Sequence, residues 1–104
     1  MVRQIEAREL RARLEAGERP VIVDVREAWE IALAPLPAAT HVPMGEIEER
    51  LGELDPRVET LVICQAGVRS LHVAHYLASR GFVDAVNVAG GIVALTSGDE
   101  SGIV

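Results

Sequence analysis

The chain has 104 residues, of which 49% are hydrophobic and 25% charged, as in a globular domain with a packed core and unlike a disordered chain. Its formal net charge is -6 and all 10 basic side chains are arginines, which argues against nucleic acid or an acidic membrane surface as a partner. The single cysteine excludes an internal disulfide, and no stretch approaches the roughly 20 apolar residues of a membrane span. We therefore expect a soluble, cytoplasmic protein.

Two helices and a strand are predicted in the first part of the chain. Residues 7–16 carry leucines four apart among arginines and glutamates and precede a glycine, which indicates a surface helix. Residues 21–25 (VIVDV) form a short β-branched run, typical of a strand covered on both faces. A brief helix is expected over residues 26–33. A proline-punctuated loop follows over residues 34–43, with a short extended piece at 40–42.

Helices and strands also alternate in the second part. Residues 47–54 place apolar side chains at i, i+4 and i+7 among glutamates, which predicts an amphipathic helix. Residues 61–63 indicate a buried strand, and residues 70–80 carry the broad apolar stripe of a helix with a polar opposite face. Residues 85–88 indicate another strand, and the glycines at 90–91 indicate a turn.

The order of these elements predicts the architecture. Strands and helices alternate and the strands are largely apolar, which favours an α/β fold with a central parallel sheet and helices on both faces. We expect a single domain over residues 1–96 and a flexible tail over residues 97–104. In such sheets, ligands bind beyond the carboxyl ends of the strands. Cys64 follows the strand predicted at residues 61–63 and therefore lies at such an end.

Cys64 stands where a strand gives way to a turn and a helix, and its surroundings favour the thiolate, the nucleophilic form. Backbone amides of residues 65–70 can converge on the sulfur as an anion-binding nest. The positive end of the helix dipole points the same way, and Arg69 adds a permanent cation. Gly67 permits a tight loop, and Ser70 can cap the helix or donate a hydrogen bond into the loop. This pattern predicts a reactive cysteine.

The competing interpretation is an inert core cysteine. Free cysteine is among the most buried residue types, and residues 61–64 (LVIC) suit the end of a core strand. The glycine, arginine and serine that follow at 67, 69 and 70 favour the reactive interpretation, because a core strand alone does not require them.

The stretch 64–70 (CQAGVRS) resembles the C-x-x-G-x-R-S active-site loop of the rhodanese-like sulfurtransferases. Residues 21–30 (VIVDVREAWE) resemble the N-terminal signature of that family, and residues 35–44 and 86–92 follow in family order with similar spacing. Residues 34–39 (APLPAA) differ from the family's usual loop, because they lack its Gly-His pair. The resemblance spans most of the chain.

This resemblance implies a five-stranded parallel sheet flanked by helices and a cysteine that carries sulfane sulfur as a persulfide. Cys64 would be the nucleophile, and Arg69 would bind an anionic donor and assist departure of its leaving group. The backbone amides of the loop would hold the persulfide, with Gln65, Ala66, Gly67, Val68 and Ser70 as substrate-binding residues. Thiosulfate or a persulfide would be the donor, and cyanide, a small thiol or a thioredoxin-like protein the acceptor. No cofactor is implied.

Other functions remain open at this point. A cysteine phosphatase or arsenate reductase has five residues between Cys and Arg, whereas four separate Cys64 from Arg69. A catalytically silent interaction module of the same fold is a further alternative, as is a persulfide relay between proteins.

Some polar and aromatic residues outside the loop also need an interpretation. Asp24 and Arg26, at the end of a strand, are expected in a structural network or at the edge of the pocket. Three histidines, at 41, 72 and 75, are interpreted as surface residues, and no metal site is predicted. Trp29 is expected in the core.

Overall fold

Five parallel strands form one sheet in the computed structural model, which describes residues 2–97. Their order is β1-β5-β4-β2-β3, and every neighbouring pair is parallel. The strands are β1 (Arg3–Glu6), β2 (Val21–Asp24), β3 (Thr40–His41), β4 (Thr60–Ile63) and β5 (Ala85–Ala89). The central parallel sheet expected from the sequence, and the five strands that the resemblance implies, are confirmed.

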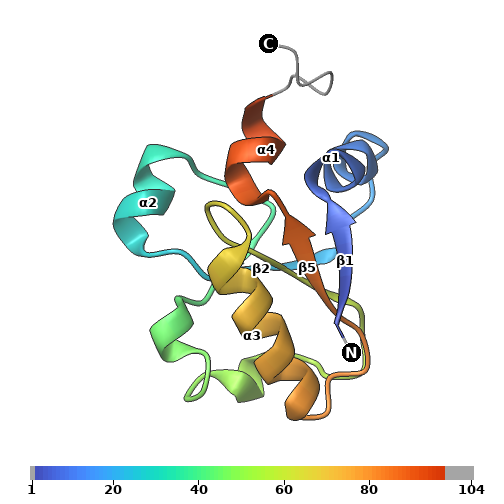
Figure 1. Ribbon diagram of the computed structural model, residues 1–104, viewed down its shortest axis with the longest axis vertical. Helices are drawn as coiled ribbons and strands as arrows, with labels where there is room; N and C mark the ends of the chain where they lie inside the picture. The colour runs from blue at the N-terminus through green and yellow to red at the C-terminus, as the bar shows by residue number, and fades with distance from the viewer. Residues whose placement is uncertain (1, 98–104) are drawn as a thin grey trace.

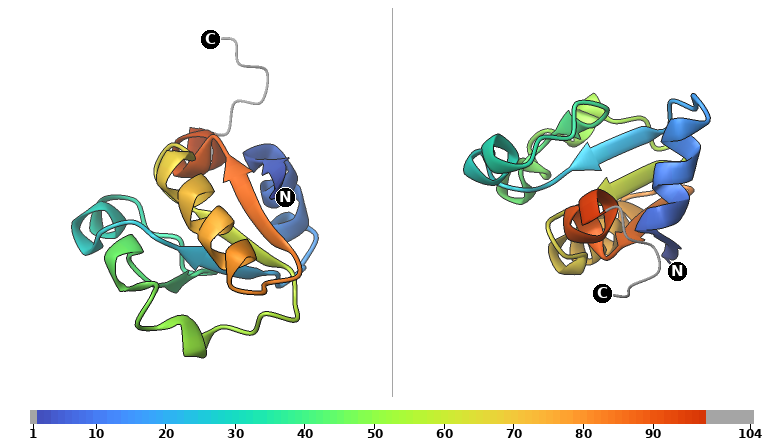
Figure 2. Two further views of the ribbon diagram at one scale, coloured as in Figure 1. Left: turned by 60° about the horizontal axis from the view of Figure 1, so that its bottom comes forward. Right: turned by 90° about the horizontal axis from the view of Figure 1, so that it is seen from above.

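Helices cover both faces of this sheet (Figures 1 and 2). They are α1 (Ala7–Glu15), α2 (Ala28–Leu33), α3 (Val68–Ser79) and α4 (Gly91–Ser97), with two short 3-10 helices, η1 (Met44–Glu46) and η2 (Leu51–Glu53). The side chains of α1 and α4 pack with one set of strand residues, and those of α3 and the η1–η2 segment pack with the other. Each face of the sheet therefore has its own hydrophobic core.

The central strand β4 contributes to both cores. Leu61 and Ile63 pack in the core beneath α1 and α4, whereas Val62 and Cys64 pack in the core beneath α3. This alternation follows from the two-residue period of a strand, and burial on both faces explains why the residues that follow Thr60 in β4 are all apolar. The side chain of Cys64, at the end of this central strand, therefore lies on the face of the sheet that α3 covers.

Two sequence predictions need correction here. β1 was missed, because this edge strand has a single buried residue, Ile5, and so lacks an apolar pattern. The helix predicted over residues 47–54 is wrong: residues 47–50 form turns, and the short 3-10 helix η2 follows them. Gly52 weakens an α-helix there, while Ile47 still packs in the core.

The glycine turn at 90–91 is present but leads into a helix that was not predicted. Both glycines have positive φ, 84° and 59°, and α4 begins at the second of them. Ser97, expected in the tail, ends α4, and the rest of the predicted tail lies outside the described residues. Within residues 2–97, no helix is long and apolar enough to cross a bilayer.

Candidate functional site

The thiol of Cys64 lies at the carboxyl end of β4 and is enclosed by the loop that leads into α3. The residue is only 1% exposed and its thiol is free. Three groups lie around Sγ: the backbone N–H groups of Gly67 and Ser70 donate to it at 3.2 and 3.3 Å, and the Ser70 hydroxyl lies 3.2 Å from it. The loop thus forms the anion-binding nest that its sequence predicts, with the sulfur at its centre.

The first turn of α4 fixes the backbone of this loop. The N–H of Ile92 donates to the carbonyl of Cys64 at 2.9 Å, and the N–H of Val93 donates to the carbonyl of Gln65 at 3.0 Å. These carbonyls therefore face α4, which leaves the amides that follow them to face the sulfur. Gly67 completes the turn with φ of 98°, a conformation that a residue with a side chain rarely adopts.

Ser70 is the third residue of α3 and does not cap the helix. The N-cap is Gly67, which has no side chain, so the first of the two roles offered for Ser70, the helix cap, is wrong. The Ser70 hydroxyl donates instead to Oδ1 of Asn87 on β5, at 2.6 Å. Asn87 Nδ2 in turn donates to the carbonyl of Gly67 and to Oε1 of Gln4. Because Ser70 has one hydroxyl hydrogen, Asn87 and an ionised Cys64 compete for it.

The balance of burial and hydrogen bonding lowers the pKa of Cys64 below its ordinary value. Burial has the largest single effect and raises this pKa, since it disfavours the charged form. The Ser70 hydroxyl and the backbone amides of Ser70, Gly67 and Ala66 together outweigh burial. A larger share of the thiol is therefore ionised at neutral pH than in an ordinary cysteine.

The Ser70→Ala variant is expected to raise the pKa of Cys64, because it removes the hydroxyl that favours the thiolate. The measurement is a pH titration of thiolate ultraviolet absorbance, supported by the pH dependence of alkylation by iodoacetamide. Since Cys64 is the only cysteine, both signals report on it alone. Ser79→Ala, at an exposed serine of the same helix, is the matched control. An unchanged pKa in Ser70→Ala would contradict this assignment.

Arg69 forms a two-pronged ion pair with Glu30 of α2. Its Nη1 and Nη2 donate to Oε1 and Oε2 at 2.8 and 2.7 Å. The Glu30 side chain is 10% exposed and that of Arg69 is 35% exposed. The guanidinium is thus already bound to a carboxylate, which the sequence did not predict. Hydrogen bonding to Glu30 raises the pKa of Arg69 most, and the charge of Cys64 raises it further.

Glu30 is strongly held in its ionised form. The hydrogen bonds from Arg69 lower its pKa to about 2, against the opposing effect of burial, and the backbone N–H of Glu27 lowers it further. The ordinary value is 4.5, so the ion pair contributes its full stabilisation above about pH 4.5. That contribution is lost as the pH falls toward 2.

Asp24 and Arg26 form a buried network beneath the loop. Arg26 is 0% exposed and Asp24 2% exposed, and their side chains meet at 2.8 Å. The same guanidinium donates to the carbonyl of Ala34 at 2.8 Å and, at 3.4 Å, to Oε1 of Gln65. The network thus ties β2 and the end of α2 to the loop residue that follows Cys64.

The remaining residues that the sequence analysis singled out differ in their relation to the Cys64 thiol. Ala66 contributes its backbone amide to the hydrogen bonding that lowers the pKa of Cys64. The side chain of Val68 is 66% exposed, so it points away from the buried thiol. His41 Nε2 lies 2.7 Å from the carbonyl of Arg26. Among the described residues, no three metal-ligating side chains cluster together.

A small hollow of about 180 Å³ lies beside the loop, lined by Trp29, Glu30, Leu33, Ala34 and Gln65. Trp29 is 66% exposed and Leu33 78% exposed, so the prediction that Trp29 packs in the core is wrong. The reason is that the short helix α2 turns Glu30 toward the interior, which leaves the adjacent Trp29 at the surface.

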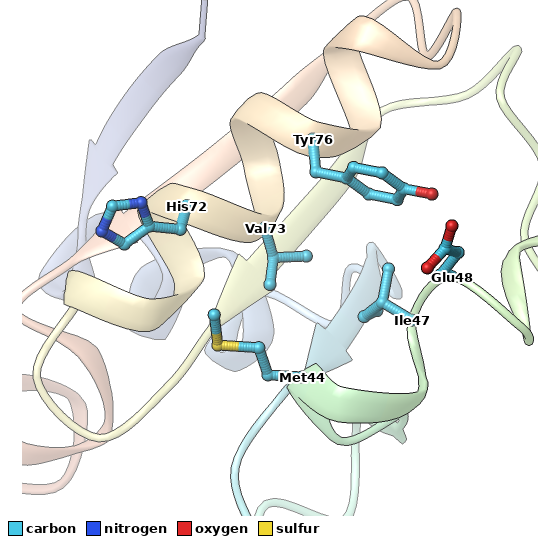
Figure 3. Close-up of a pocket in the computed structure, with 6 residues that line it drawn as sticks. All are labelled: Met44, Ile47, Glu48, His72, Val73 and Tyr76. Atoms are coloured by element: carbon cyan, nitrogen blue, oxygen red, sulfur yellow. The ribbon is translucent and has the colours of Figure 1, made fainter.

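A second groove, of about 270 Å³, lies between η1 and α3 (Figure 3). Its lining residues are Met44, Ile47, Glu48, His72, Val73 and Tyr76, and Cys64 is not among them. This groove lies along α3 and is separate from the loop.

Glu30, Asn87 and Gly91 belong to the site but were not predicted. Asn87 interrupts a strand that is otherwise apolar, and such a buried polar residue is a signal that the sequence offered. Gly91 was recognised only as part of a turn. Glu30 gave no local signal, because its partner Arg69 lies 39 residues away.

Comparisons with known proteins agree with the fold and with the family that the sequence resembles. The model of the rhodanese-like domain family matches residues 6–97. YtwF of Bacillus subtilis (strain 168), named a candidate sulfurtransferase, is 40% identical over 93 residues, which are 89% of each chain. A protein of Allochromatium vinosum named sulfurtransferase is 34% identical, over 90% of this chain and 88% of its own. The crystal structure of a rhodanese-like domain protein from Staphylococcus aureus superposes with a TM-score of 0.84 at 37% identity, covering 95% and 94% of the two chains.

Proposed function

Because this chain belongs to the rhodanese-like domain family, we propose that it transfers sulfane sulfur from a donor to a thiophilic acceptor through a persulfide on Cys64. The names of its relatives support a sulfurtransferase in general terms. The observation that carries the specific proposal is the Cys64 thiol, which two backbone N–H donors and the Ser70 hydroxyl surround at 3.2–3.3 Å. Such a nest stabilises a negatively charged sulfur, either the thiolate or the persulfide formed from it.

The reaction has two steps. In the first, the Cys64 thiolate attacks the outer sulfur of thiosulfate, so that a new S–S bond forms, the old one breaks, and the bonding electron pair leaves with sulfite. In the second, cyanide or a thiol attacks the outer sulfur of the persulfide, and Cys64 departs as a thiolate. Electrons balance within each step, and ping-pong kinetics are expected.

The loop residues have distinct roles in this proposal. The backbone amides of Gly67 and Ser70, which already bond to Sγ, stabilise the thiolate before transfer. As the sulfur chain extends by one atom, the amides of the whole loop, from Gln65 through Val68 to Ser70, surround the outer sulfur. Arg69 is the cation of the loop, and it supports an anionic donor and its leaving group to the extent that its ion pair with Glu30 leaves its charge unbalanced. Asp24 and Arg26 support the edge of this pocket through Gln65.

The test is the intact mass of the protein after incubation with thiosulfate, and again after cyanide. The native protein should gain one sulfur atom and then lose it as thiocyanate, whereas Cys64→Ser should gain none. Glutathione persulfide is the second donor. If neither donor produces an adduct on the native protein and the thiol alkylates at the rate of an ordinary cysteine, the proposal is wrong.

The other functions considered for this chain have less support. A phosphate-sized anion needs a longer loop than the four residues between Cys64 and Arg69, which disfavours a phosphatase or arsenate reductase. A silent interaction module does not require an activated thiol. A persulfide relay remains within the proposal, with a thioredoxin-like protein as acceptor. The single free thiol suits a reducing, cytoplasmic compartment.

A further inference from the structure

We propose that Glu30 determines which sulfur donors the site accepts, by neutralising Arg69 and so disfavouring dianions such as thiosulfate relative to persulfides of uncharged organic thiols. This inference rests on the proposed sulfur transfer to Cys64. It concerns the class of donor, which the family resemblance leaves open.

The first observation is the geometry of the ion pair. Arg69 donates from both terminal nitrogens to both carboxylate oxygens of Glu30, at 2.8 and 2.7 Å. A carboxylate bound in this way takes two of the five N–H donors of the guanidinium and balances the positive charge that would attract a sulfonate or sulfate-like group. An anionic donor must therefore displace Glu30 or bind beside an arginine whose charge is already balanced.

The second observation is that Glu30 is difficult to displace. Its side chain is 10% exposed, and its Oε1 also accepts the backbone N–H of Glu27 at 2.9 Å. Moving this carboxylate would leave a partly buried charge without its partner, which is costly. A dianion approaching the loop therefore meets a fixed negative charge beside Arg69.

The third observation is the hollow next to the ion pair. Trp29 and Leu33, both largely exposed, line it together with Glu30 and the loop residue Gln65. An uncharged organic group can bury apolar surface against the two side chains, whereas thiosulfate has no such group. The hollow and the ion pair thus favour the same class of donor.

The chemistry with such a donor is balanced. The Cys64 thiolate attacks the outer sulfur of the protonated persulfide R–S–SH, and a new S–S bond forms. The old S–S bond breaks and its electron pair leaves with R–S⁻, while the proton stays on the transferred sulfur. The attacking Cys64 thiolate and the departing R–S⁻ each carry one negative charge. The net charge therefore does not change in this step, and no contact from Arg69 to the leaving group is needed.

The experiment compares kcat/KM for thiosulfate and for the persulfide of 2-mercaptoethanol, with cyanide as acceptor, in the native protein and in Glu30→Gln. Glutamine at this position still accepts the N–H of Glu27, so α2 retains its start. We expect Glu30→Gln to raise kcat/KM for thiosulfate by about tenfold, mainly through a lower KM, on the scale of one partly screened charge. The value for the persulfide should change by less than about threefold.

The matched control is Glu49→Gln, which removes one negative charge from an exposed residue that belongs neither to the loop nor to the lining of the hollow. We expect this variant to leave the ratio of the two kcat/KM values unchanged, because the proposed effect depends on the contact between Glu30 and Arg69 and not on the net charge of the protein. The native protein gives an independent measurement that needs no variant: its kcat/KM should be higher for the persulfide than for thiosulfate.

The possible failures are distinguishable. If both donors load Cys64 but Glu30→Gln leaves their ratio as in the native protein, or if the native protein prefers thiosulfate, the inference about Glu30 is wrong and the proposed function stands. If neither donor loads Cys64 in any variant, the proposed function is wrong and the inference falls with it. A rise for both donors alike would indicate a general structural effect and would also overturn the inference.

Discussion

The Arg26→Met variant should lower the free energy of unfolding by about 3–5 kcal/mol, the scale measured when one partner of a buried ion pair is removed. Arg26 is 0% exposed, and methionine fills much of its volume without replacing its hydrogen bonds. The substitution leaves the carboxylate of Asp24, 2% exposed, without its cation. It also leaves the carbonyl of Ala34 without a donor. Urea unfolding followed by circular dichroism measures the effect.

Two further variants separate this explanation from a general loss of packing. Adding Asp24→Asn to Arg26→Met removes the orphaned charge and should restore part of the lost stability. Arg57→Met is the matched control, since Arg57 is 85% exposed and pairs with Asp55 at the surface. Its loss should change stability by no more than about 1 kcal/mol. Equal effects of Arg26→Met and Arg57→Met would contradict a buried ion pair.

The parts of the fold that could be predicted are those whose signal lies within a short stretch. Strand β4 is buried on both faces, so its residues form an apolar run. The helix α3 was recognised from its apolar stripe, although it begins at Val68, two residues before the predicted start. The loop was predicted because its glycine, arginine and serine occur at fixed distances from Cys64. In each case local sequence and final structure agree.

The parts that could not be predicted depend on contacts between distant segments. Strand β1 exists because it pairs with β5, and its own residues are mostly exposed. The segment from η1 to η2 has apolar positions that suit an α-helix, and only its packing in the core beneath α3 and its two glycines select shorter turns. A pattern read along one stretch cannot reveal either contact.

The same distinction applies within the site. The sequence places a cation near Cys64, but not the carboxylate that binds it, because Glu30 comes from a helix preceding β3. It offers Ser70 as a cap, whereas the hydroxyl bonds to Asn87 across the sheet. Local motif reasoning thus finds the Cys64 thiol and the amides around it. It does not find the residues from other elements that hold the arginine and the serine in place.

The Gly91→Ala variant should both destabilise the protein and weaken the activation of Cys64. Gly91 has φ of 59°, and a Cβ added there would overlap the carbonyl oxygen of Cys64 and approach that of Gln65 to 2.6 Å. These are the two carbonyls that α4 holds through its first backbone amides. Left-handed strain and overpacking together should cost about 2–5 kcal/mol in the free energy of unfolding.

The effect of Gly91→Ala on the thiol follows from the same contacts. If the carbonyls of Cys64 and Gln65 shift away from α4, the amides of Gly67 and Ser70 no longer converge on Sγ, and the pKa of Cys64 should rise. Thiolate absorbance against pH and the extent of sulfur loading from thiosulfate measure this, at a temperature where the variant is still folded. Gly52→Ala, where an added Cβ meets nothing within 4 Å, is the control. A destabilised Gly91→Ala variant with an unchanged thiol pKa would show that α4 stabilises the fold without shaping the nest around the sulfur.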